Sequence, residues 1–195
     1  MRTKARIELV KSGILWRKLV SLMDETAQTL VRTSFSTLMR GNNHFACVVS
    51  DARGQLLAQS SDSIPSFVET VPFTLRSTVR KFPSDALHPG DVLITNDPWL
   101  GTGHLNDVSV AMPIFFRNKH IGFVANVAHH NDIGGSANPY ARKYFEEGLL
   151  IPIVKAVDQG RENPTFFDMS RGNVRSPEVT IGDLSAQMAS LCPRG

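Results

Sequence analysis

Cysteine and long apolar runs are both scarce in this chain of 195 residues. The two cysteines, Cys47 and Cys192, lie far apart and match no zinc-binding spacing, which in a chain of this size indicates free thiols in a reducing compartment. No apolar run approaches the roughly 20 residues that a membrane-spanning helix needs. The basic residues 1–6 are followed by amphipathic sequence, not by the apolar core of a signal peptide. We therefore expect no membrane association and a cytoplasmic location.

Concentrated basic charge and two common catalytic motifs are also missing. The formal net charge is +3, and no run of Lys or Arg is interleaved with aromatic residues. That distribution argues against nucleic-acid binding. The sequence has no Gly-x-x-x-x-Gly-Lys-Ser/Thr phosphate loop, so a nucleotide site, if the activity needs one, is expected on another chain or domain. The Gly-x-Ser-x-Gly turn of serine hydrolases is absent too.

Hydrophobic periodicity predicts an α+β fold. Apolar residues recur at three- and four-residue steps between residues 7 and 39, which is typical of an amphipathic helix. Short apolar runs around polar or glycine-containing turns indicate antiparallel β-hairpins, and no βαβ alternation appears. The other expected elements are a hairpin over 45–49 and 55–59, a helix over 67–82, a strand over 92–95, a hairpin over 108–116 and 120–129, a short apolar element over 149–157 and a helix from about 183 to 192.

These elements predict how the domain is built. We expect the antiparallel hairpins to form a mixed sheet with the helices on one face, and Trp16 of the long helix to face the core. The chain ends just past its last helix without a closing element. Residues 1–195 are therefore expected to be an incomplete domain, the N-terminal portion of a larger subunit.

Most of the concentrated polar chemistry lies in two short stretches, residues 96–107 and 128–135, joined by a strand-like apolar run. They hold three of the six histidines and three aspartates among glycines, which let a backbone approach a ligand closely. These residues are Asp97, His104, Asp107, His129, His130 and Asp132. Histidines and carboxylates brought to one place can form a metal site.

The hairpin between the two stretches predicts which of these residues meet. With a turn near Asn118, residues whose numbers add up to about 236 face each other, so Asp107 is expected opposite His129 and His130, with His104 just beyond it. Side chains alternate along a strand, so the two adjacent histidines point to opposite faces unless the strand bends. A β-bulge would shift the register by one residue. Two imidazoles and one carboxylate suit Mn, Fe or Zn.

Simpler interpretations exist for the same features. Asn-Asp-Pro and Gly-Thr-Gly are common turn sequences, and Asp132 could form an Asx-turn. Residues 171–175 could bind an anion or form a solvated loop, residues 146–148 resemble a helix end, and Trp99 could line a substrate pocket. Three further histidines lie in or beside turn sequences and are interpreted as structural or solvated: His44, His88 and His120.

Five motifs carry a family resemblance. They are TNDPWLGTGHLND (95–107), AHHNDIGG (128–135), FEEGLLIP (145–152), NVR (173–175) and GDLSAQ (182–187). In this order they resemble the front portion of the hydantoinase B family. That family includes the B-type component of ATP-dependent hydantoinases, the corresponding half of 5-oxoprolinase, and a large subunit of acetone and acetophenone carboxylases. The resemblance spans essentially the whole chain, although family members are much longer.

The resemblance implies an ATP-dependent enzyme of two subunits. A hydantoinase A-type partner would bind ATP and phosphorylate a carbonyl or enolate oxygen of the substrate. The B-type component would complete ring opening or carboxylation at a divalent metal, Mn or a similar ion, with Zn or Fe as alternatives. The family's candidate ligands match three residues of this chain, and the hairpin register adds a fourth: Asp97, His104, Asp107 and His129. His130 and Asp132, which match only in residue type, are expected to transfer protons.

Three functions follow from these expectations. The first is a subunit of an ATP-dependent hydrolase that opens a five-membered cyclic amide or imide, such as a hydantoin or 5-oxoproline. The second, within the same family, is a ketone carboxylase subunit, which the shared motifs do not separate from the first. The third is a non-catalytic assembly module that only binds the partner subunit.

Overall fold

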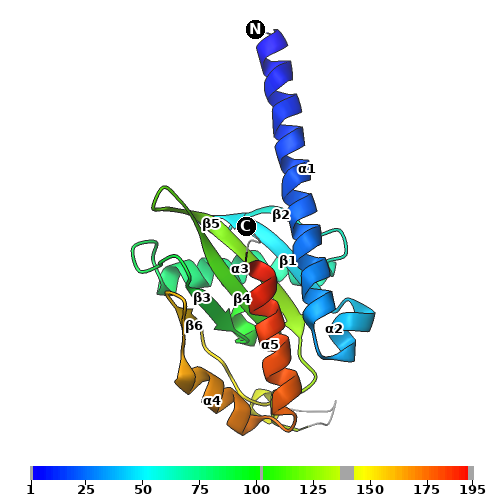
Figure 1. The fold of residues 1–195 in the computed structure, drawn as a ribbon, viewed down its shortest axis with the longest axis vertical. Coiled ribbons are helices and arrows are strands. Elements are labelled where there is room, and N and C mark those ends of the chain that lie inside the picture. The colour runs from blue at the N-terminus through cyan, green and yellow to red at the C-terminus, as the bar shows by residue number, and fades with distance from the viewer. Residues whose placement is uncertain (1, 102, 137–142, 193–195) are drawn as a thin grey trace.

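A computed structural model describes residues 2–101, 103–136 and 143–192. The described strands are β1 (Phe45–Asp51), β2 (Leu56–Gln59), β3 (Val92–Thr95), β4 (Asp107–Phe116), β5 (Lys119–His129), β6 (Val154–Asp158) and β7 (Arg161–Glu162). The helices are α1 (Arg2–Thr33), α2 (Thr37–Asn42), α3 (Pro65–Lys81), α4 (Pro164–Asn173) and α5 (Pro177–Leu191), with short 3₁₀ turns η1 (Pro98–Leu100) and η2 (Tyr144–Glu146). The strands form one sheet in the order β2-β1-β5-β4-β3-β6-β7 (Figure 1).

The α+β class and both antiparallel hairpins are confirmed. Every strand pairing recorded in the sheet is antiparallel, so the expectation of a mixed sheet is wrong in that respect. The pairs β1–β2, β4–β5 and β6–β7 are joined by short turns and β3–β4 by a longer loop, whereas β1–β5 and β3–β6 pair strands that are not consecutive in the chain. The sequence patterns of such strands do not by themselves exclude a parallel pair at the sheet edge.

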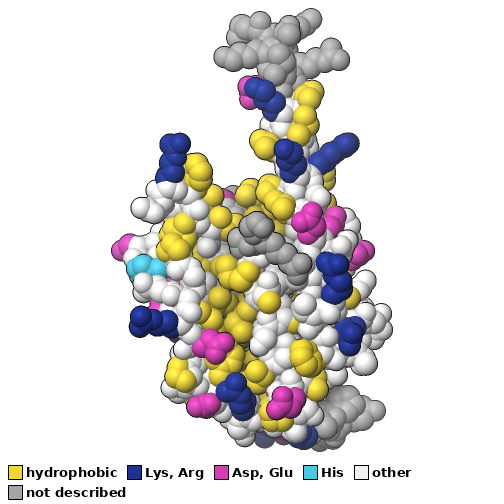
Figure 2. Space-filling view, viewed as in Figure 1, with side chains coloured by type: hydrophobic (Ala, Val, Ile, Leu, Met, Phe, Trp, Pro, Cys, Tyr) yellow, Lys and Arg dark blue, Asp and Glu magenta, His cyan; other side chains and the backbone are white. Residues whose placement is uncertain are grey.

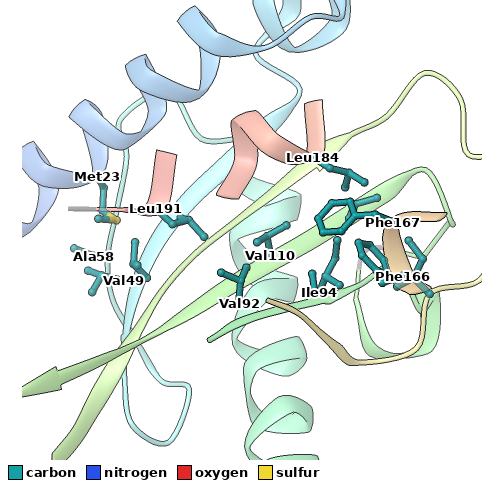
Figure 3. Close-up of a cluster of buried hydrophobic side chains, with 14 residues drawn as sticks. Met23, Val49, Ala58, Val92, Ile94, Val110, Phe166, Phe167, Leu184 and Leu191 are labelled. Atoms are coloured by element: carbon teal, nitrogen blue, oxygen red, sulfur yellow. The ribbon is translucent and has the colours of Figure 1, made fainter. Parts of the chain in front are cut away.

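Helices cover both faces of the sheet, not one as predicted. Successive strand residues point to opposite faces, and in β1 the first six of seven residues are buried. Val49 and Val110 pack on the face covered by α1, α4 and α5 (Figure 3). Their neighbours Val48 and Ala111 pack on the other face, against α3. The central strands are apolar on both sides, and this two-sided pattern requires two helical layers.

The long helix expected over residues 7–39 is divided into α1 and α2. Asp183 of α5 accepts hydrogen bonds from the backbone N–H groups of Phe35 (2.7 Å) and Ser36 (3.1 Å), which lie between the two helices. Ser36 is also the N-cap of α2, and its side chain accepts the N–H of Met39. These acceptors satisfy N–H groups that a helix start leaves unpaired, so they stabilise the break.

The first half of α1 extends beyond the body of the molecule (Figure 1). Trp16, expected in the core, is 57% exposed. Val10, Ile14 and Leu15 are exposed as well, and hydrophobic side chains are visible along this part of the helix (Figure 2). The later residues of α1 cover the sheet, whereas its first half projects beyond the edge of the sheet and, among the residues that the structure describes, has nothing to pack against there. Within the described ranges, no helix combines the length and apolar character needed to cross a membrane.

The C-terminal part contains a helix that the sequence patterns did not indicate. Asn163 caps α4 by accepting the N–H of Phe166 (3.2 Å), and Pro164 occupies the first turn. Asn followed by Pro is a helix-start signal that the Gly- and Pro-rich composition of the region obscures. Likewise α5 begins at Pro177 and not near residue 183. Of the apolar element expected over 149–157, only residues 154–157 are in a strand, β6, which ends one residue later at Asp158.

The two free thiols should differ sharply in reactivity. Cys47 on β1 is 0% exposed, and burial raises the pKa of its thiol, whereas Cys192 at the end of α5 is exposed. Because the thiolate is the reactive form, we expect a disulfide reagent to label only Cys192 in the native chain and both thiols in denaturant. Mass spectrometry of the labelled peptides checks this. Equal native labelling of Cys47 would contradict its placement in the core.

Candidate metal centre

The β4–β5 hairpin places Asp107 directly opposite His129, as the register predicted from the sequence requires. Arg117 and Asn118 form its two-residue turn with positive φ angles of 49° and 63°. Such a pair of residues matches the right-handed twist of the two strands. The carboxylate and the imidazole therefore come together through local chain geometry.

A β-bulge close to the turn decides this register. The numbers of paired residues add up to 235 next to the turn and to 236 beyond the bulge, where Ile121 is the unpaired extra residue. Without the bulge, Ala128 would face Asp107, and the side chain of His129 would point to the other face of the sheet. The pairing of Asp107 with His129 at the far end of the hairpin therefore requires the bulge.

The carboxylate of Asp107 contacts two imidazoles. Its Oδ1 lies 2.8 Å from Nδ1 of His129, and its Oδ2 lies 2.7 Å from Nε2 of His104. Asp107 is buried, while the side chains of His104 and His129 are 41% and 22% exposed. The centroids of the two rings are 5.0 Å apart. The hydrogen bond that His104 donates to the carboxylate of Asp107 raises the pKa of His104, although partial burial opposes this shift.

These three side chains fit the requirements of a cation site. One ligand atom from each of them lies within 4.8 Å of the other two. Two imidazole nitrogens and a carboxylate oxygen are ligands that Zn, Mn and Fe accept. The partly exposed rings leave the group accessible from solvent. The simpler interpretation of the same contacts is a pair of histidine–carboxylate hydrogen bonds, which is also how a protein orients metal-binding histidines.

Asp97, the fourth expected ligand, lies outside this group. It follows β3, and its Oδ1 accepts the backbone N–H of Trp99 (3.0 Å), which caps η1. Trp99 is 80% exposed. The role of Asp97 in metal binding therefore stays a prediction.

His130 extends toward α5, on the other face from Asp107, as strand alternation predicts. Its ring is 1% exposed, and Nε2 lies 2.7 Å from Oε1 of Gln187. The amide nitrogen of Gln187 donates to the carbonyl of Val108 (2.9 Å), so its oxygen is the acceptor and Nε2 of His130 carries the hydrogen. Burial lowers the pKa of His130, which favours the neutral ring.

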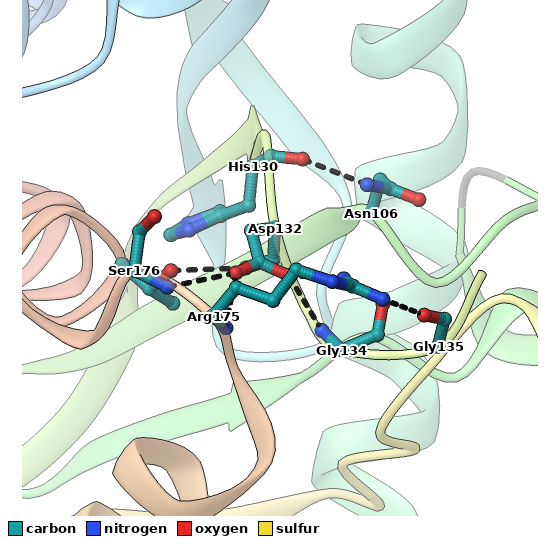
Figure 4. Close-up of polar contacts among 8 residues, drawn as sticks. Asn106, His130, Asp132, Gly134, Gly135, Arg175 and Ser176 are labelled. Atoms are coloured by element: carbon teal, nitrogen blue, oxygen red, sulfur yellow. Dashed lines mark hydrogen bonds and ion pairs between the residues drawn. The ribbon is translucent and has the colours of Figure 1, made fainter. Parts of the chain in front are cut away.

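Asp132 connects the segment after β5 to the link between α4 and α5 (Figure 4). Its Oδ1 accepts the N–H of Gly134 (3.0 Å), which confirms the Asx-turn interpretation, and its Oδ2 accepts the N–H of Ser176 (3.0 Å). The guanidinium of Arg175 contacts Oδ1 (3.1 Å) and donates to the carbonyl of Gly135. Burial opposes the effect, but these N–H donors lower the pKa of Asp132. The guanidinium of Arg175 is thus bound within the protein, by Asp132 and by the carbonyl of Gly135.

Two residues near the group were not among the expected site residues. The ring of His44, which precedes β1, lies edge-on to that of His129, with the centroids 5.9 Å apart. Glu147 accepts the N–H of Leu105 (2.9 Å), and its charge contributes to raising the pKa of His104. The local sequence around Glu147 resembles only a helix end. Its position inside one of the five sequence motifs is the signal that could have found it.

Comparisons with known proteins agree with this picture. The model of the family described as hydantoinase B/oxoprolinase matches residues 8–192. The putative B-type component of a D-/L-hydantoinase from Pseudomonas sp. is 31% identical over 192 residues, which cover 95% of this chain and 32% of the relative. The crystal structure of ATP-dependent caprolactamase from Pseudomonas jessenii superimposes with a TM-score of 0.82 and 25% identity over 93% of this chain and 32% of that chain.

A nucleotide-free acetone carboxylase structure has a TM-score of 0.83 at 20% identity, over 94% of this chain and 25% of that chain, and shows that the fold is shared. The chain spans about a third of the length of the first two curated relatives it matches and 12–15% of the length of the 5-oxoprolinases. The family match includes all five sequence motifs and the His104–Asp107–His129 group. The chain therefore belongs to the hydantoinase B/oxoprolinase family.

Proposed function

We propose that the chain is the cation-binding part of a subunit that opens a cyclic amide or imide in an ATP-dependent hydrolase. The observation that carries the proposal is the His104–Asp107–His129 group in a chain of the hydantoinase B/oxoprolinase family. A hydantoinase component and a caprolactamase are among its relatives, and both names denote enzymes of cyclic amides or imides. We take a five-membered ring of the hydantoin or 5-oxoproline type as the substrate.

The three side chains of the group would hold a divalent cation. The family resemblance favours Mn²⁺, with Zn²⁺ or Fe²⁺ as alternatives that the same ligands accept. Such a cation supplies a positive charge that polarises a carbonyl oxygen or lowers the pKa of a water molecule. The buried carboxylate of Asp107 brings one nitrogen of each imidazole to the same place, and the partly exposed rings of His104 and His129 leave room for a substrate. Asp97 remains a candidate for a further oxygen ligand.

The contacts of His130 and Asp132 support structural roles in place of the expected proton transfer. The imidazole of His130 is buried and bonded to Gln187, and both carboxylate oxygens of Asp132 accept hydrogen bonds from the backbone. A group that transfers protons needs access to the reacting atoms. We therefore assign both residues to holding the segment that follows His129.

We infer that ATP binds to a partner chain of the hydantoinase A type. The relatives include the B-type component of a hydantoinase and the beta chain of a caprolactamase, designations that imply a second kind of subunit. We place the complex in the cytoplasm, because both cysteines of the chain are free thiols.

The test combines the purified chain, a hydantoinase A-type partner and Mn²⁺, and follows ATP consumption with three substrates offered separately: hydantoin, 5-oxoproline, and acetone with bicarbonate. We expect ATP hydrolysis that depends on a cyclic amide and falls to background in the double variant His104→Ala/His129→Ala. ATP consumption only with acetone and bicarbonate would support a ketone carboxylase instead. No consumption with any of the three would support the non-catalytic assembly module.

A further inference from the structure

The backbone next to His104 is held by two side chains from other parts of the fold. Leu105 is 0% exposed, and its N–H donates to Oε2 of Glu147 (2.9 Å). Its carbonyl accepts a hydrogen bond from Nδ2 of Asn96 (2.8 Å). Both polar groups of this residue are therefore fixed, although the loop that contains them forms no strand or helix at this point.

Asn96 fixes one side of this arrangement. Its side chain also donates to the carbonyl of Leu149 (2.9 Å) and accepts the N–H of Ile151 (2.6 Å). Asn96 is 3% exposed, so water does not reach its side-chain amide, and these hydrogen bonds within the protein satisfy the amide instead. The loop of His104 and the segment that follows Glu147 are thereby joined through one buried amide.

The segment of Glu147 is itself packed tightly against the loop that follows His129. The N–H of Leu149 donates to the carbonyl of Ile133 (2.8 Å). A Cβ atom on Gly135 would lie 2.4 Å from the carbonyl carbon of Glu147, and one on Gly148 would lie 2.5 Å from the oxygen of Ile133. Both glycines have positive φ angles, 62° and 141°. Only glycine allows this approach of two backbones, so close packing determines where the backbone of Glu147 lies.

Building on the proposed cation site, we propose that Glu147 is a positioning residue for His104. It accepts the N–H of Leu105, and together with Asn96 this holds the backbone that aims the imidazole of His104 at Asp107. His104 needs such support because it lies on a loop, whereas Asp107 and His129 are fixed by the β4–β5 hairpin. Groups that orient a metal ligand commonly contribute about 10- to 100-fold to metal affinity.

Two substitutions at this position separate an acceptor role from a general packing role. Glu147→Ala removes the oxygen that accepts the N–H of Leu105. Glu147→Gln keeps an oxygen acceptor of nearly the same shape and removes only the charge. We expect Glu147→Ala to weaken Mn²⁺ binding about 10- to 100-fold and Glu147→Gln to recover most of that loss. Glu146→Ala, which removes the same charge one residue earlier, is the matched control and should bind Mn²⁺ like the native chain.

Electron paramagnetic resonance of Mn²⁺ titrated into the 195-residue chain measures the affinities. Amide hydrogen exchange supplies an independent readout, because the N–H of Leu105 should exchange faster in Glu147→Ala while that of Leu149 stays protected. Native affinity in Glu147→Ala, or equal weakness of the Ala and Gln variants, would overturn the positioning role. If the native chain itself bound no Mn²⁺, Zn²⁺ or Fe²⁺, the proposed cation site would fall instead, and faster exchange at Leu105 would still report the contact with Glu147.

Discussion

Replacing Asp107 by asparagine should lower the affinity of the chain for Mn²⁺ by more than about 100-fold, beyond the loss typical of groups that only orient a ligand. Asp107 is 3% exposed and contacts both His104 and His129. Asparagine has nearly the same shape, but it has no negative charge, and its NH₂ group cannot accept the hydrogen bond that one of the two imidazoles now donates. The affinity is measured by titration with Mn²⁺ under the same conditions for both chains.

Asp85→Asn is the control for this substitution. Asp85 is exposed in the turn between α3 and β3, so the variant loses the same charge at a distance from the group. We expect its Mn²⁺ affinity to equal that of the native chain. Thermal unfolding of Asp107→Asn without metal shows whether the variant is folded. A folded Asp107→Asn chain with native affinity would refute the assignment of the cation site.

Replacing Gln187 by leucine should lower the free energy of unfolding by about 3 kcal/mol or more, since each buried polar group left without a partner costs about 1–3 kcal/mol. Gln187 is 0% exposed, and its side chain bonds to His130, to the carbonyl of Val108 and to the side chain of Asn126. Leucine satisfies none of the three. For a domain of this size the melting temperature should fall by roughly 6–12 °C.

The matched control is Gln28→Leu on the exposed side of α1. Surface substitutions of this kind usually change the free energy of unfolding by no more than about 0.5 kcal/mol. Equilibrium unfolding in urea compares the two variants with the native chain. If Gln187→Leu were as stable as Gln28→Leu, the hydrogen bonds of the Gln187 side chain would not contribute to the free energy of unfolding.

Elements with a strong local pattern could be predicted from the sequence. The two hairpins and the helix over 67–82 follow from alternation, turn residues and periodicity, all of which act over a few neighbouring residues. The exposure of Trp16 could not be predicted, because its helical position looks like that of a core residue and only the edge of the sheet shows where packing ends. The second helical layer was missed because α3 and α5 have no pattern that says which face they cover.

The candidate site divides in the same way. The residue types, the hairpin and its turn at Arg117 and Asn118 are properties of the sequence by itself, and they determine that a carboxylate and a histidine come close. The bulge at Ile121 was decided by the folded sheet, and it selects His129 over Ala128 as the partner of Asp107.

Contacts between distant segments were decided by the tertiary structure alone. Glu147 reaches Leu105 across 42 residues, Arg175 reaches Asp132 across 43, and Gln187 reaches His130 across 57. Local propensity carries no information about such pairs, because they form only when the helices and the sheet have packed. The sequence by itself therefore determined which residue types come near one another at the end of the β4–β5 hairpin, and tertiary packing decided which of them meet and which other residues hold them in place.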